Sequence, residues 1–443
     1  MVQSNTARFL TTYGMVLVLL LLVVLFSVLT VSEQHPAGDA AARALLDELP
    51  AAQPSGPVFV TGRTTAEDSA FVTATIAGLR EHGWTEPQTV YGSPSEIRAV
   101  IDHSGGVETG TITVLTTQPM RATVRAIVND LAPGSTVLVP PSRRYPTFLL
   151  ADNLRNIANQ ISVIAIVAVG MTMVIITAGI DLSVGSLIAL AAVIGAWLIG
   201  LMGGTDAGAG AMIVGSLGAI VLSGLVGAFS GAMITGFRIP PFIATLAMMQ
   251  VASGLAYILS QGRPIYQLPE SYVGLGRGAE PLLGIPWAVL LMLLLYVIAH
   301  FVMSRTVYGR AIYAVGGNEE AARLAGIRVK RVLLSVYVVS GALAGLGGIV
   351  MASQLKSGAP TYGLMYELYV IAAVVVGGTS LAGGEGRIFG TLIGAFIIAV
   401  IQNGMNLTNV ESYTQKVVLG LVILAAVLLD RLKHQGWRLR KKG

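Results

Sequence analysis

Long apolar stretches dominate this chain, and polar residues interrupt them only briefly. A run of about 20 apolar residues forms a helix that can cross the roughly 30 Å hydrocarbon core of a bilayer. Such runs predict ten transmembrane helices, at about 12–31, 157–177, 185–202, 211–234, 241–260, 285–303, 332–352, 365–380, 388–405 and 413–429. The glycine-rich stretch from Gly377 to Arg387 predicts a turn between the eighth and ninth helices.

The segment at 33–150 has a different pattern. Strand-like stretches such as 57–62 and 111–117 alternate with amphipathic stretches such as 66–83. This alternation predicts a parallel sheet with helical crossovers. We therefore expect an all-α polytopic membrane protein with an extracytoplasmic α/β domain inserted between its first and second helices. The segment contains no G-x-G-x-x-G and no P-loop, so it is either a docking or structural insert or a ligand-binding module.

The pattern divides the chain into four parts. These are an N-terminal anchor helix at 1–32, the α/β insert at 33–150, a membrane domain of about nine helices at 151–430, and a basic tail at 431–443. The first helix could instead be a signal peptide. Its apolar core, from Met15 to Val31, exceeds the roughly 7 to 15 residues typical of signal peptides, and no clear A-x-A site follows. An uncleaved anchor is the better interpretation.

Composition supports a membrane protein and excludes several kinds of site. Hydrophobic residues make up 54% of the chain and charged residues only 12%, against about 25% charged in soluble domains. There is no cysteine, which excludes disulfides, thiolate metal sites and cysteine nucleophiles. The 5 histidines are scattered. We expect no metal site, no catalytic residue and no nucleic-acid partner.

The distribution of Lys and Arg predicts the orientation in the membrane. If the N-terminus is cytoplasmic, the basic residues of the loop at 304–331 and of the tail at 431–443 fall on the cytoplasmic side. The short outer loops then hold few basic residues, as the positive-inside rule requires. We expect both termini to be cytoplasmic.

Asp181 is an acidic residue between two strongly apolar stretches, in the sequence "AGIDLSVGS". It could cap a helix that begins near Leu182. It could also border a transport pathway, because non-helical backbone at membrane depth persists only where protein or a water-filled cavity covers it. The two interpretations are compatible. A proton relay has less support, because the predicted helices provide no second buried charge beside Asp181.

Other polar residues of the predicted helices could line the same pathway or form hydrogen bonds between helices. With Asp181, the candidate pathway residues are Thr172, Thr177, Ser183, Gln250, Gln402 and Asn403.

The cytoplasmic loop from Ser304 to Arg331 contains signals for a short helix at 319–325. A turn at Gly316 and Gly317, an N-cap at Asn318, acidic residues in the first turn and Gly326 after the last turn all favour it. Its apolar side could enter a groove on another protein, or it could be a structural elbow. The candidate contact residues are Gly316, Gly317, Asn318, Glu319, Glu320, Ala321, Ala322 and Gly326. No Walker A sequence is present, so another subunit must bind any ATP.

Four sequence motifs together resemble a known family. The stretches "AVGMTMVIITAGIDLSVGSLIAL", "PPFIATLAMM", "AVGGNEEAARLAGI" and "AAVVVGGTSLAGGEGRIFGTLIGAFI" closely resemble the permease subunits of bacterial ABC importers for ribose and related sugars. The resemblance covers about 150–430. It implies a helix at 318–326 that contacts a cytoplasmic ATPase.

The resemblance also implies the partners of this chain. They are a second permease subunit, identical or related, two cytoplasmic ATPase subunits that bind ATP and Mg²⁺, and an extracytoplasmic sugar-binding protein, all at the bacterial inner membrane. The chain itself would hold no cofactor. The insert departs from the family, whose members usually have a short link there, and it is faintly similar to one lobe of a sugar-binding protein.

We therefore expect a transport subunit, not an enzyme, that moves a monosaccharide inward within an ABC importer and contacts membrane lipid. Two alternatives stay open. An ion-coupled secondary transporter would show uptake that follows a proton gradient and ignores ATP. A membrane-anchored sensor would bind ligand in its outer domain without transport.

Overall fold

The computed structural model describes residues 5–49, 56–84, 86–103 and 110–440. Its internal contacts divide the chain into two units. One contains the first helix, α1 (Asn5–Leu29), together with the chain from Phe148 onward, and the other is Val31–Thr147. The last three residues of the predicted basic tail, 441–443, lie outside the described residues.

The smaller unit contains a four-stranded parallel sheet in the order β3-β2-β4-β5. Its strands are β2 (Val58–Gly62), β3 (Gln88–Tyr91), β4 (Thr113–Thr116) and β5 (Thr136–Leu138). In the central strand β2, Phe59 pairs with Gln88 on one side and with Val114 on the other. A separate antiparallel pair joins β1 (Val31–Gln34) to β6 (Arg143–Pro146).

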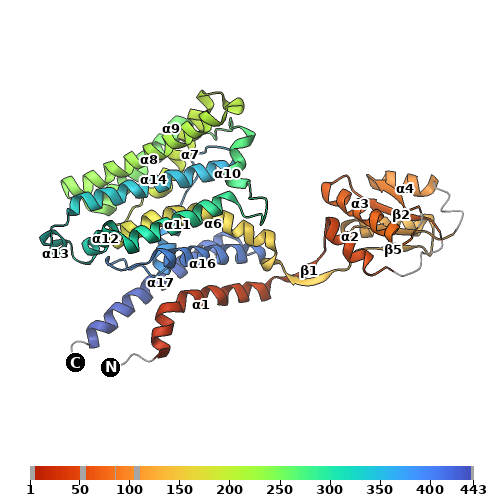
Figure 1. The fold of residues 1–443 in the computed structure, drawn as a ribbon, viewed down its shortest axis with the longest axis horizontal. Coiled ribbons are helices and arrows are strands. Elements are labelled where there is room, and N and C mark those ends of the chain that lie inside the picture. The colour runs from red at the N-terminus through yellow and green to blue at the C-terminus, as the bar shows by residue number, and fades with distance from the viewer. Residues whose placement is uncertain (1–4, 50–55, 85, 104–109, 441–443) are drawn as a thin grey trace. The chain divides into compact units, whose positions relative to one another are not determined.

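Four helices of this unit connect and cover the strands (Figure 1). They are α2 (Gly38–Leu46), α3 (Ala66–Glu81), α4 (Pro94–His103) and α5 (Arg121–Leu131). Successive side chains of a strand point to opposite faces. Val58 and Val60 accordingly pack with apolar residues of α2 and α3, whereas Phe59 packs with those of α4 and α5. Both faces of the sheet are therefore covered.

The larger unit is helical, and seven of its described helices are long and apolar enough to cross a membrane. They are α6 (Ala151–Ile176), α7 (Val184–Leu201), α8 (Ala209–Phe237), α9 (Pro241–Ser260), α11 (Trp287–Arg305), α14 (Val329–Leu355) and α16 (Ile388–Leu407). In the most apolar part of α6, 89% of the residues are buried, against 22% in α9. Helix α6 therefore lies in the centre of the bundle and α9 at its surface.

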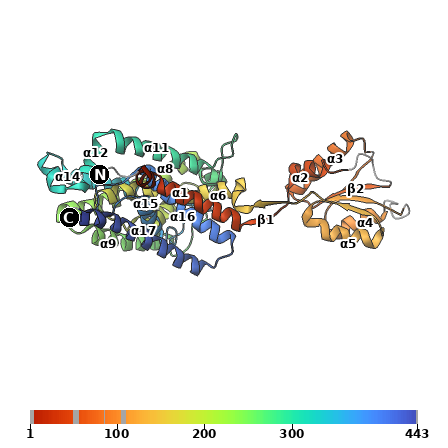
Figure 2. The same ribbon diagram turned by 90° about the horizontal axis from the view of Figure 1, so that it is seen from below.

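Further helices complete this unit. They are α10 (Gly274–Arg277), α12 (Val307–Gly317), α13 (Glu319–Leu324), α15 (Tyr366–Val376) and α17 (Ser412–Arg440), with 3₁₀ turns at Thr147–Leu149, Gly204–Asp206 and Glu270–Val273. Helix α1 lies beside α16 in both views (Figures 1 and 2). The two approach closely at Gly404, where an added Cβ would collide with the ring of Phe26.

The fold class predicted from the sequence is wrong. Seven of the described helices are candidate spans, where ten were predicted, because the apolar stretches of the other three are shorter: Gly14–Leu29, Tyr366–Val376 and Ser412–Leu428. The predicted α/β insertion between the first and second spans is wrong as well. The strands form only small sheets, and they precede α6, the first of the seven candidate spans. Counting apolar residues overestimates spans because an apolar run can continue past the end of a helix, as it does after α15 ends at Val376.

Small residues bring α8 and α14 into backbone contact. A Cβ at Gly227 of α8 would collide with the carbonyl oxygen of Tyr337 on α14, and a Cβ at Gly341 of α14 would collide with that of Ser223 on α8. Glycine at such positions lets membrane helices approach closely. The contact fixes the part of α14 that carries Tyr337 and Ser340.

Candidate pathway and coupling site

The chain is non-helical between α6 and α7, where Asp181 lies. Helix α6 ends at Ile176 and α7 begins at Val184, with Ala178 between them at a φ of 60°. This left-handed conformation ends the first helix, and L-residues other than Gly, Asn and Asp adopt it rarely. The break predicted from the sequence is present, but the helix after it begins at Val184 and not near Leu182.

Asp181 is fully buried and accepts three hydrogen bonds. Its Oδ1 accepts from the backbone N–H of Ser183 at 3.0 Å and from the Ser183 hydroxyl at 2.6 Å. Its Oδ2 accepts from the hydroxyl of Ser340 on α14, at 2.8 Å. Burying a carboxylate is costly unless hydrogen bonds replace the lost water, and these three donors supply that replacement. They hold the non-helical segment around Asp181 against α14.

Another residue of α14 and one of α9 also contribute to the surroundings of the break. The hydroxyl of Tyr337 on α14 is buried and has no hydrogen-bond partner among the described residues, and a Cβ added at Gly179 would lie 2.5 Å from it. From α9, Thr245 Oγ1 donates to the carbonyl oxygen of Ile180 at 3.2 Å. The backbone of the break is therefore covered by protein, as irregular backbone at membrane depth requires.

A second non-helical stretch, at 357–365, runs along α7 and precedes the short helix α15. Gly358 exchanges two backbone hydrogen bonds with Ile265, and an added Cβ there would collide with the carbonyl oxygen of Ala192. An added Cβ at Gly185, in the first turn of α7, would collide with Oε2 of Glu367 on α15. Half-buried Glu367 therefore lies against the start of α7, close to this second non-helical stretch.

The loop at 377–387 joins the break at Asp181 to helix α12. The N–H of Gly384 donates to the carbonyl oxygen of Ile176, the last residue of α6, at 2.8 Å. An added Cβ at Gly316 of α12 would collide with the same carbonyl oxygen. Tyr313 of α12 donates from its hydroxyl to the carbonyl oxygen of Gly386 at 2.9 Å. The ends of α6 and α12 thus meet on this loop.

Gly316 and Gly317 do not form the turn predicted from the sequence. Both belong to the last turn of α12, and the chain turns at Asn318 instead. The reason is the packing of α12 on Ile176, where only a residue without a side chain fits. Gly316 therefore serves close helix packing and not a change of direction.

Helix α13 is capped at both ends. Oδ1 of Asn318 accepts from the N–H of Ala321 at 2.9 Å. At the other end Gly326 has a φ of 83°, its N–H donates to Arg323 O, and the N–H of Ile327 donates to Ala322 O. This pair of bonds is a Schellman motif. The helix spans Glu319–Leu324, one residue less than the predicted 319–325.

The surface of α13 is mostly free within this chain. Ala322 is buried against the helix bundle, whereas Glu319, Glu320 and Ala321 are exposed and Leu324 is 83% exposed. An exposed ion pair of 3.7 Å joins Glu320 to Arg323, and such surface pairs contribute little stability. An exposed leucine beside acidic residues is suited to contact another protein.

The structure separates the other candidate pathway residues. Buried Thr172 lies 2.8 Å from Thr391 of α16, oxygen to oxygen, and Asn403 exchanges two amide hydrogen bonds with Asn153 of α6. Both therefore join helices α6 and α16. Thr177 is buried at the end of α6 and donates to Val174 O, whereas Gln402 is half-buried and Gln250 exposed. Of the set, only Thr177, Asp181 and Ser183 lie together, at the break.

Sequence reasoning missed Ser340, Tyr337 and Thr245. Each is a polar residue inside a predicted span, which was the available signal, but the sequence offered many such residues. Their proximity to Asp181 depends on how α9 and α14 pack, and no local pattern encodes that packing.

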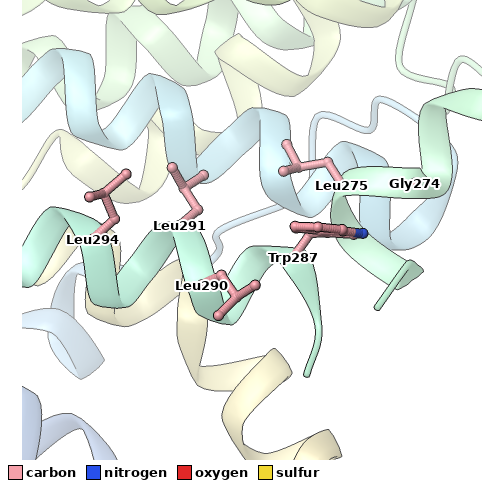
Figure 3. A pocket seen from close by; sticks show the side chains of 6 residues that line it. All are labelled: Gly274, Leu275, Trp287, Leu290, Leu291 and Leu294. Carbon is pink, nitrogen blue, oxygen red and sulfur yellow. The ribbon is translucent and has the colours of Figure 1, made fainter. Parts of the chain in front are cut away.

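An apolar pocket of about 440 Å³ lies between α10 and α11. Figure 3 shows Leu275 of α10 beside Trp287 and Leu291 of α11. The indole N–H of Trp287 is the single polar side-chain group lining it, so it does not fit a polar solute. Among the described residues, no three His, Asp or Glu side chains come together as a metal site.

Several permease proteins of sugar transport systems are similar in sequence to this chain. The ribose import permease protein RbsC of Escherichia coli (strain K12) is 45% identical over 295 residues, which are 65% of this chain and 88% of that protein. The D-allose transport system permease protein AlsC of the same strain is 39% identical over 285 residues, 64% of this chain and 85% of that protein. The L-arabinose ABC transporter permease protein AraH of Azospirillum brasilense is 36% identical over 300 residues, 68% and 86% respectively.

No solved structure matches the chain. A family profile matches residues 153–427, which contain the breaks, the loop at 377–387 and α13. The match covers more than half of the chain. The chain therefore belongs to the family described as branched-chain amino acid transport system / permease component.

Proposed function

We propose that this chain is the membrane subunit of an ATP-binding cassette importer that carries a monosaccharide into a bacterial cell. The family description names branched-chain amino acids. The relatives at 36–45% identity are named for ribose, allose and arabinose transport, and they support a sugar as the transported solute. The chain acts as a transport subunit without its own catalytic reaction. Its termini are cytoplasmic in this proposal, as the Lys and Arg distribution favours.

One observation carries the mechanism: α12 connects helix α13 to the break at Asp181. Asn318 follows α12 directly, and Gly316 touches the last carbonyl of α6. We propose that a cytoplasmic ATPase subunit, which binds ATP and Mg²⁺, contacts the exposed side of α13. A displacement of α13 then moves α12 against the end of α6. Such a contact drives transport only if the ATPase binds the two arrangements of the helices with different affinity.

The break at Asp181 is the element we propose to change during transport. Its hydrogen bonds to Ser183 and Ser340 stabilise the closed arrangement. Separating α14 from the break would expose the carboxylate, the serine hydroxyls and the unpartnered hydroxyl of Tyr337 to the pathway. These groups bind a neutral polyhydroxylated solute through hydrogen bonds. A second permease subunit and an extracytoplasmic sugar-binding protein complete the proposed importer.

Uptake by reconstituted vesicles tests the proposal. The full chain is reconstituted with an ATPase and a binding protein encoded beside it, and labelled ribose, allose, arabinose and leucine are supplied outside. We expect ATP-dependent uptake of at least one sugar and none of leucine. Uptake that follows a proton gradient without ATP would contradict the importer. ATP-driven uptake of leucine alone would contradict the proposal that the solute is a sugar.

The contact with the ATPase is tested separately. Reversing both charges in Glu319→Lys/Glu320→Lys should abolish capture of the ATPase by the purified chain. The matched control is Lys330→Glu/Arg331→Glu, which reverses two exposed charges at the start of α14. Equal capture by both variants would contradict a contact at α13.

A further inference from the structure

A cavity of about 480 Å³ opens between helices α1, α11, α12 and α16. Its walls are mostly apolar and include Met15 of α1, Met303 of α11, and Ile388 and Ile393 of α16. It lies within the larger unit and contains none of the candidate pathway or coupling residues predicted from the sequence. The proposed transport function uses α12 and the loop at 377–387, but it assigns no role to the cavity itself.

The cavity carries a positive charge that nothing in its lining balances. Arg387 directly precedes α16, and the ion pairs found among the described residues do not include it. None of the described residues that line the cavity is acidic. Burial raises the pKa of Tyr313, another lining residue, and the nearby charge of Arg387 partly opposes that rise. The cavity thus attracts an anionic group.

The mouth of the cavity lies on a flank of the bundle that is itself apolar. The ring of His300 on α11 contacts the ring of Phe389 on α16 in a tilted arrangement with centroids 4.7 Å apart, and both side chains are exposed. Along the same helix α11, Val297 and Phe301 are about 60% exposed. Because α11 is a candidate span, this flank faces hydrocarbon when the protein is in a membrane. The occupant therefore comes from the lipid phase.

We propose that this cavity binds an anionic phospholipid, with the phosphate at Arg387 and part of an acyl chain along the apolar walls. Basic pockets between membrane helices are suited to anionic head groups. A zwitterionic lipid such as phosphatidylcholine also has a phosphate, but its choline cation offsets that charge, so it would neutralise Arg387 less well than an anionic lipid. Free phosphate would leave the apolar walls uncovered. Because Met15 comes from α1, the bound lipid also holds α1 against α11 and α16.

Competitive lipid binding tests this proposal. The full-length protein in mild detergent is incubated with equal amounts of phosphatidylglycerol and phosphatidylcholine that have the same acyl chains. Native mass spectrometry then gives the ratio of the two lipids retained. We expect the wild type to retain phosphatidylglycerol preferentially. Arg387→Gln should lower this preference about five-fold, which corresponds to ~1 kcal/mol for one basic side chain near an anionic surface.

Two variants distinguish this site from general charge effects. Arg331→Gln removes an exposed cation that does not line the cavity, and it should leave the ratio unchanged. Ile393→Trp narrows the cavity while keeping Arg387, and it should reduce retention of phosphatidylglycerol.

Three outcomes would overturn the proposal. In the first, the wild type retains both lipids equally. In the second, the ratio of retained phosphatidylglycerol to phosphatidylcholine is the same in Arg387→Gln as in the wild type. In the third, inorganic phosphate at millimolar concentration releases the bound phosphatidylglycerol. If Arg387→Gln instead abolished ATPase capture without changing the lipid ratio, the cavity would belong to a protein interface.

Discussion

The hydroxyl of Ser340 donates a hydrogen bond of 2.8 Å to Oδ2 of Asp181. The two residues are 159 positions apart in the sequence, and both are fully buried. The bond ties α14 to the break between α6 and α7. Since Ser183 supplies both donors to the other carboxylate oxygen, Ser340 is the donor that comes from another helix.

Ser340→Ala should destabilise the protein. It leaves Oδ2 of a buried carboxylate without its donor, which costs ~1–3 kcal/mol. We expect a lower midpoint of thermal unfolding in detergent. The control is Thr235→Ala in α8, where the half-buried hydroxyl bonds only within its own helix, to Gly231. Equal midpoints for the two variants would show that the bond to Asp181 does not stabilise the break.

Gly316→Ala should uncouple α13 from the membrane helices, whereas Gly317→Ala should not. A Cβ at Gly316 meets the backbone carbonyl of Ile176, which cannot rotate away, whereas a Cβ at Gly317 has no atom of the described residues within 4 Å. Overpacking of this kind costs ~1–3 kcal/mol and would shift α12. The measurement is ATP-dependent uptake together with ATP hydrolysis by the assembled importer. Matching losses of uptake in both variants would argue against a specific contact at Gly316.

The caps of α13 should determine how often that helix opens. Asn318→Ala removes the side-chain acceptor for the N–H of Ala321 and should cost ~1 kcal/mol, whereas Asn318→Ser keeps a capping oxygen. Hydrogen exchange at 319–324 measures the difference. We expect faster exchange in Asn318→Ala alone. If Asn318→Ser exchanged as fast, the cap would not control the helix.

Acid should destabilise the smaller unit through Asp68. Burial raises the pKa of this carboxyl, but hydrogen bonds from Arg63 outweigh burial, and its pKa lies below the usual value of about 3.9. A carboxyl with a lowered folded-state pKa stabilises the fold above its unfolded pKa. That stability is lost as the pH falls through the folded value.

Arg63→Gln should therefore move the acid transition to higher pH. Trp84 is 3% exposed in this unit, so its fluorescence, in a variant that keeps Trp84 as the sole tryptophan, reports the transition. Arg80→Gln, which removes an exposed cation from the same unit, is the control. An unshifted transition in Arg63→Gln would show that the ion pair does not govern acid stability.

Local patterns in the sequence were sufficient for several elements. The cap at Asn318 and the left-handed Gly326 follow from chemistry within a few residues, and the structure has both. The break near Asp181 could be predicted because a charge seldom interrupts an apolar span without a reason. The ten spans could not be counted correctly. Composition alone does not reveal that α15 ends at Val376, four residues before the end of the predicted span at 365–380.

The sequence by itself determined an apolar, helical protein with a capped helix after the sixth predicted span and a carboxylate in a break. Each of these features depends on residues that are close together in the sequence and on the helical period. Only the tertiary structure decided that Asp181 meets Ser340, that Gly316 packs on Ile176, and that Arg387 lines a mostly apolar cavity without an ion pair to any described residue. These relationships depend on the packing of helices distant in the chain, because close contact between small residues sets the approach of whole helices.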